Sequence, residues 1–88
     1  MRIIVEKNKT KIITKDYQGE VQEEVLVLGY EDIRKYGFQV VDHMTENIVP
    51  KIKTSEEVFL EGDSLEAKMI ARKIEDKIKR DVIILDKN

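Results

Sequence analysis

The sequence predicts a small α+β domain, in which a mostly antiparallel β-sheet is covered on one face by one C-terminal amphipathic helix. Short β-branched segments near the N-terminus, a helical apolar spacing over about residues 63–80 and a final apolar segment at residues 82–85 predict this class. Two independent cores would leave about 44 residues each, close to the limit for an unsupported core. We therefore expect residues 1–88 to form a single domain.

The first fifteen residues are expected to form a β-hairpin. Two β-branched runs, at residues 3–5 and 12–14, flank a polar stretch at residues 7–10 that suits a tight turn. Residues 16–19 read Asp-Tyr-Gln-Gly and predict a second turn. Residues 25–28 are apolar at both alternating positions, which is typical of a strand covered on both faces, so we place them at the heart of the sheet.

The middle of the chain combines one helical and several extended patterns. Residues 30–36 predict a short helix. Residues 38–43 and 48–53 alternate in polarity around a polar turn and predict a hairpin, whose second arm Pro50 would place at a sheet edge. Residues 58–60 are a further strand candidate.

The C-terminal helix has the clearest signals. Asp63 is a good N-cap, and Glu66 three residues later completes a capping box. The apolar residues that follow form one helical stripe: Ala67, Ile70, Ala71, Ile74 and Ile78. The segment 82–85 follows almost without a loop and is expected to return as a buried strand.

Composition excludes several classes of site and favours one compartment. The chain has no cysteine, so it has no disulfide framework, thiolate zinc site or cysteine nucleophile. Its N-terminus has only three consecutive apolar residues, which predicts neither a signal peptide nor a membrane span. We expect a soluble, cytoplasmic protein without membrane contact. The net charge of -2 does not indicate nucleic acid by itself.

No residue pattern indicates catalysis, a cofactor or a metal. His43 is the only histidine, and no metal-ligand spacing surrounds it. The adjacent carboxylates at residues 23–24 and 56–57 would point to opposite faces of a strand, so neither pair forms a close dyad. We expect no enzyme activity, no catalytic residues, no cofactor and no metal.

Four lysines give the sharpest indication of a nucleic-acid partner. Lys7, Lys9, Lys11 and Lys15 share one parity along the hairpin, and a basic β-ribbon can contact a phosphate backbone. Hairpin tips are also rich in lysine for solubility, and no aromatic residue is interleaved with these lysines. The following block, residues 16–32, carries six acids and no base, which would repel phosphate.

Aromatic residues next to acids suggest a protein interface. The candidate interface residues are Tyr30, Glu31, Asp32, Tyr36 and Phe38. Alternatively, Tyr36 and Phe38 fill the core of a chain that lacks tryptophan.

The sequence favours a non-catalytic binding or regulatory module that acts through protein–protein interaction. One alternative is a nucleic-acid-binding accessory protein that uses the basic hairpin, and another is a small-ligand binder that uses His43 and nearby carboxylates. A homodimer is also expected, because a small sheet leaves two edges and residues 82–85 or 3–5 would offer an edge with few charges.

Overall fold

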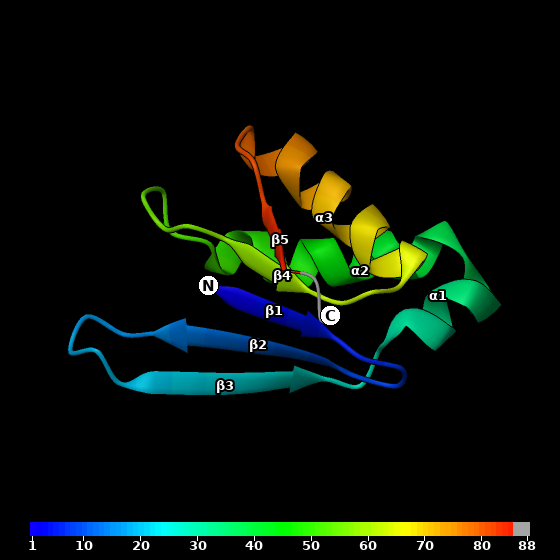
Figure 1. Cartoon of the computed structure of the whole chain (residues 1–88), viewed down its shortest axis with the longest axis horizontal. Helices are drawn as coiled ribbons and strands as arrows, with labels where there is room; N and C mark the ends of the chain where they lie inside the picture. The colour runs from blue at the N-terminus through cyan, green and yellow to red at the C-terminus, as the bar shows by residue number, and fades with distance from the viewer. Residues whose placement is uncertain (86–88) are drawn as a thin grey trace.

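Five strands form one sheet, and helices pack on one of its faces in this computed structural model, which describes residues 1–85 (Figure 1). The elements in chain order are β1 (Arg2–Val5), β2 (Thr10–Lys15), β3 (Val21–Leu26), α1 (Tyr30–Tyr36), α2 (Phe38–Ile48), the 3-10 turn η1 (Val49–Lys51), β4 (Phe59–Glu61), α3 (Leu65–Ile78) and β5 (Ile83–Leu85). The predicted α+β class is therefore confirmed, whereas the prediction that the C-terminal helix alone covers the sheet was wrong, because α2 packs there too.

The sheet is mixed, with the strand order β3-β2-β1-β4-β5. The β1–β2 and β2–β3 pairs are antiparallel, so the predicted N-terminal hairpin is confirmed. The β1–β4 and β4–β5 pairs are parallel, so the prediction of a mostly antiparallel sheet was wrong. For β4 and β5 the reason is that α3 lies between them and carries the chain back to the starting end, and the helices α1 and α2 similarly precede β4.

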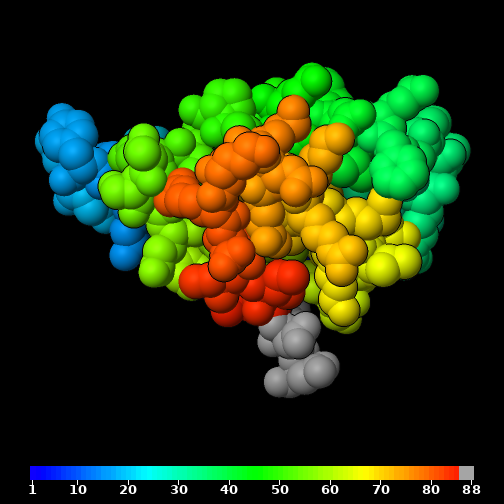
Figure 2. Space-filling model, turned by 90° about the horizontal axis from the view of Figure 1, so that it is seen from above, coloured from blue at the N-terminus to red at the C-terminus, as the bar shows by residue number. Residues whose placement is uncertain are grey.

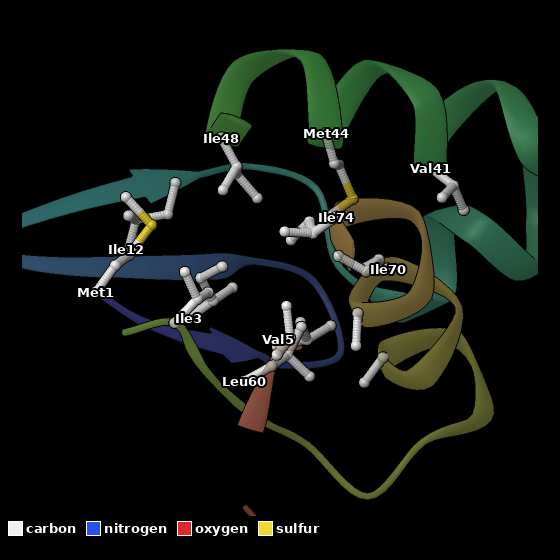
Figure 3. Packing of buried hydrophobic residues seen from close by; sticks show 14 of the residues in the cluster. Met1, Ile3, Val5, Ile12, Val41, Met44, Ile48, Leu60, Ile70 and Ile74 are labelled. Carbon is white, nitrogen blue, oxygen red and sulfur yellow. The ribbon is translucent and has the colours of Figure 1, made fainter. Parts of the chain in front are cut away.

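The core lies between the sheet and the helices α2 and α3 (Figure 3). Side chains that meet there without solvent exposure come from both layers: Ile3, Leu60, Met44, Ile48, Ile70 and Ile74. The predicted stripe of α3 is confirmed at its first four positions, and Ile78 is half-buried at the margin. Within residues 1–85, no helix covers the opposite face of the sheet.

Residues 38–48 form α2 and not the first arm of a hairpin. Val41, Met44, Thr45 and Ile48 are buried at helical spacing, and this burial outweighs the alternation of Phe38 and Val40. Pro50 lies in η1 and not at a sheet edge, because its fixed φ suits the start of a 3-10 turn.

The apolar run at residues 25–28 is not the centre of the sheet. The strand begins earlier, at Val21, and β3 lies at an edge of the sheet while β1 is central. Leu26 and Leu28 pack against the core, whereas Val25 and Val27 are exposed. The run was apolar on both faces, but only one face of this sheet is covered by helices.

Two details at the C-terminal end also differ from prediction. The N-cap of α3 is Ser64 and not Asp63, since the Ser64 hydroxyl accepts a hydrogen bond from the amide of Ala67. The helix ends at Ile78, where Lys79 adopts a left-handed conformation with φ 58°. β5 is an edge strand with partly exposed Ile83 and Ile84, so the expectation of a buried strand was wrong.

The predicted short helix α1 is confirmed and is anchored on the β1–β2 turn. The amides of Tyr30 and Glu31 donate hydrogen bonds to the carbonyl oxygens of Glu6 and Lys7. Helix N-terminal amides lack partners within the helix, so these two carbonyls satisfy them. The close backbone contact fixes α1 at the end of the sheet.

Candidate protein-binding surface

Phe38 stands at the edge of a groove between α2 and α3. It is the first residue of α2, and its side chain is 73% exposed. The groove has a volume of about 320 Å³, and the other residues that line it are Val41, Asp42, Met69, Arg72, Lys73 and Asp76. Figure 2 shows α2 (green) and α3 (orange and yellow) side by side on this side of the molecule. An exposed aromatic ring thus adjoins a hollow with an apolar floor.

An ion pair bridges the two helices across this groove. Lys73 Nζ lies 2.9 Å from Asp42 Oδ1, and this hydrogen bond and the attraction to the carboxylate raise the pKa of Lys73. Arg72 and Asp76 line the groove and add one charge of each sign to its rim. The surface therefore combines apolar contact with polar groups of both signs.

The structure excludes the alternative that Tyr36 and Phe38 fill the core. Tyr36 is 59% exposed and lies across Gly37 from Phe38, at the junction of α1 and α2. Gly37 has φ 80°, a conformation that glycine adopts readily, and the chain changes direction there. Both aromatic residues are therefore accessible to a partner.

Phe38 is the one groove residue that the sequence predicted as an interface residue, and two apolar residues of α3 that were not predicted lie in or near this surface. Leu65 is 71% exposed, and it lies one helical turn before Met69, on the same side of α3. The signal was present, because both apolar residues fall outside the buried stripe of α3.

The other three predicted interface residues, Tyr30, Glu31 and Asp32, make contacts that stabilise α1 itself. The Arg34 guanidinium lies 4.8 Å from the centre of the half-buried Tyr30 ring. The Asp32 carboxylate accepts a hydrogen bond of 2.8 Å from the amide of Gly29. Glu31 lies 3.6 Å from Lys7 in an exposed ion pair. These residues stabilise the start of α1 and are not part of the groove beside Phe38.

The four lysines do not form one continuous ribbon. Lys7 and Lys9 lie in the β1–β2 turn, whereas Lys15 lies at the far end of β2. Lys11 pairs with the Glu6 carboxylate at 3.5 Å, and Lys7 pairs with Glu31. The positive charges are therefore divided between two ends of the strand, and two of them face carboxylates.

A second groove, of about 510 Å³, is lined mostly by charged residues and lies between the β2–β3 hairpin and the segment from Lys51 to Glu56. It is lined by Ile12, Thr14, Lys15, Asp16, Gln22, Glu23, Glu24, Lys51, Lys53 and Glu56. Glu24 and Lys51 form an ion pair within it. His43 does not line either groove, and its nearest side-chain partner is Asn47 on the exposed side of α2. His43 therefore lies on the exposed side of α2, outside both grooves.

Residues 1–85 contain no group of three or more histidine, aspartate or glutamate side chains arranged to hold a metal ion. The helices in the same range are too short or too polar to cross a lipid bilayer. Comparison with known protein families and with curated proteins finds no match to this chain.

Proposed function

We propose that this protein is a non-catalytic protein-binding module that uses the groove between α2 and α3. The observation that carries the proposal is Phe38, an exposed aromatic residue beside an apolar groove floor formed by Val41 and Met69. Large aromatic side chains bury much apolar area in a complex, and they are enriched among the residues that dominate binding energy. The absence of cysteine fits a reducing compartment, so we place this binding in the cytoplasm.

The shape and charge of the surface suggest the form of the partner. A groove between two helices suits an amphipathic helix, whose apolar residues would cover Phe38 and Met69. Polar residues beside that apolar face would reach Arg72 and Asp76 at the rim. Opposite charges at the rim fix orientation more than they add affinity.

The test compares two exposed aromatic residues at distant places. Tyr17 in the β2–β3 turn is 91% exposed and provides the matched control for Phe38. Wild type, Phe38→Ala and Tyr17→Ala would be used to purify partners from the native host after cross-linking. We expect one protein to bind wild type and Tyr17→Ala, and its affinity to fall about 30-fold or more with Phe38→Ala.

Thermal unfolding of all three proteins tests whether Phe38→Ala loses binding only because it is less well folded. Phe38 is exposed, so Phe38→Ala should unfold at nearly the same temperature as wild type. Equal retention of every partner by the Phe38 and Tyr17 variants would refute the groove as the binding site. Retention of nucleic acid instead of protein would favour the alternative function.

A further inference from the structure

The strand β3 leaves one side of its backbone open. It is the outermost strand, pairs only with β2, and no other element of the described chain lies beyond it (Figure 1). Alternate residues of a strand direct their N–H and C=O groups to opposite sides, so half of these groups in β3 point away from β2. Such an unpaired edge is a template for the addition of another strand.

The side chains of β3 divide between the two faces of the sheet. Glu24 lies opposite the buried Ile12, so Glu24 is on the helix-covered face. Val21, Glu23 and Val25 therefore lie on the uncovered face. Val21 and Val25 are 63% and 47% exposed, although strands usually direct such residues to a core. The uncovered face thus presents an acid between two accessible valines.

On the uncovered face, the charged side chain of the edge strand itself is the acid Glu23. Glu24 is paired with Lys51, whereas Glu23 has no described cation within ion-pair distance. Lys11 and Lys15 are diagonal neighbours of Glu23, but both belong to β2 and lie on its other side. A strand added at the edge would meet the carboxylate of Glu23 directly.

A second copy of the chain does not suit this edge. In antiparallel pairing about a two-fold axis, residues directly opposite one another lie on the same face of the sheet, so two registers pair five residues of β3 with its copy. These registers place Glu23 opposite Glu23 or Glu24 opposite Glu24. Like charges directly opposite one another destabilise a strand pair. The partner should therefore be a different sequence that carries positive charge.

We propose that β3 binds an extended basic segment of another protein as an added strand. The segment has an apolar residue, a lysine or arginine and a second apolar residue at alternate positions, to match Val25, Glu23 and Val21. This arrangement is symmetric about Glu23, so the same pattern fits a parallel or an antiparallel strand. The main-chain hydrogen bonds give affinity, and the alternating side chains give specificity.

The proposal can be tested on the full chain with a synthetic peptide, acetyl-Thr-Val-Thr-Lys-Thr-Val-Thr-amide. We expect it to shift the backbone amide NMR signals of Val21–Leu26 and to slow their hydrogen exchange. A peptide with glutamate in place of lysine should bind about tenfold more weakly, because it places like charges together. Glu23→Lys should reverse this preference.

Two controls distinguish binding of the peptide as an added strand from non-specific electrostatic attraction between peptide and protein. Glu46 is exposed on α2, so Glu46→Lys makes the same charge change away from β3 and should leave peptide affinity unchanged. Methylation of alternate peptide amides should abolish binding for only one of the two alternating sets, the set that faces β3.

Some results would overturn the proposal. These are an absence of binding at millimolar peptide, equal binding to wild type and Glu23→Lys, equal tolerance of both methylation sets, or protection of β5 in place of β3. Phe38→Ala should not alter peptide binding, because Phe38 lies on the helical side, so this test is independent of the groove between α2 and α3.

Discussion

The Nε of Arg34 donates a hydrogen bond to Oε1 of Glu66 across 2.5 Å, and this contact joins α1 to the first turn of α3. A longer hydrogen bond of 3.4 Å runs from Nη2 to the second carboxylate oxygen. This hydrogen bonding lowers the pKa of Glu66 below its usual value, although burial of the residue acts in the opposite direction.

The lowered pKa predicts how stability depends on pH. Glu66 binds a proton less readily in the folded state, so its contribution is complete above the unfolded pKa of about 4.3. That contribution is lost as the pH falls through the lower folded pKa. Denaturant unfolding of wild type and Arg34→Gln should therefore show a stability difference that is largest near neutral pH and shrinks in acid. A difference that stays constant with pH would contradict this role of the pair.

Substitution of Gly29 should destabilise the attachment of α1. A Cβ at this position would lie 2.2 Å from the carbonyl oxygen of Glu6 and 2.4 Å from that of Lys7. Backbone atoms cannot move aside easily, so we expect Gly29→Ala to cost about 3 kcal/mol or more of unfolding free energy. Gly19→Ala meets open space and only the strain of φ 85°, and it should cost about 1 kcal/mol. Similar denaturation midpoints for the two variants would refute the close contact.

Ile74 should contribute strongly to the core. It has no solvent exposure and lies between α2 and the sheet (Figure 3), so Ile74→Ala should cost about 2 to 5 kcal/mol. The exposed Asp76 on the same helix provides the control, and Asp76→Ala should change stability by about 0.5 kcal/mol or less. Chemical denaturation measures both values, and equal losses would contradict the orientation of α3.

We expect a weak homodimer through β5. Ile83 and Ile84 are partly exposed on this short edge, and no charged residue lies within the strand. Two-fold pairing centred on Ile84 would place apolar side chains opposite one another, in contrast to the carboxylates of β3. Sedimentation at high micromolar concentration should show a dimer for wild type and a monomer for Ile84→Lys. A wild type that stays monomeric there would exclude this contact.

The lysines of the hairpin should bind nucleic acid only weakly. Lys7 and Lys11 already face carboxylates, and Lys15 is separated from them along the strand. We expect affinity at physiological salt below the range of about 1 to 100 micromolar that is typical of non-specific binding. Titration of labelled duplex and single strands checks this. A micromolar affinity that is lost when Lys7, Lys9, Lys11 and Lys15 are changed to glutamine would instead support the nucleic-acid function.

The sequence correctly predicted those elements whose formation depends mainly on residues close together in the chain. The first hairpin, the turn at residues 16–19, α1 and the buried stripe of α3 follow from turn residues and spacing within one element. The N-cap lies one residue later than predicted, because the Ser64 hydroxyl accepts the amide of Ala67, while Glu66 bonds Arg34, 32 residues away.

Elements that depend on the whole fold were not predictable in the same way. Residues 38–43 fit both a strand and a helix, and the core formed with α3 and the sheet selects the helix. The apolar residues 25–28 suggested a central strand, but no second helical layer covers Val25 in the described chain. Among the predicted site residues, the exposure of Phe38 became visible only once its helix was known.

The parallel pairing of β1 with β4 has a consequence for synthesis on the ribosome. Arg2 pairs with Phe59, so 57 further residues must be synthesised after Arg2 before β1 can pair with its second neighbour, β4. At about 5 to 20 residues per second, that interval lasts about 3 to 11 seconds. During this time the nascent chain can complete β1, β2 and β3, followed by α1 and α2, while β1 remains a temporary edge strand. A chaperone that shields this edge would therefore act before β4 is synthesised.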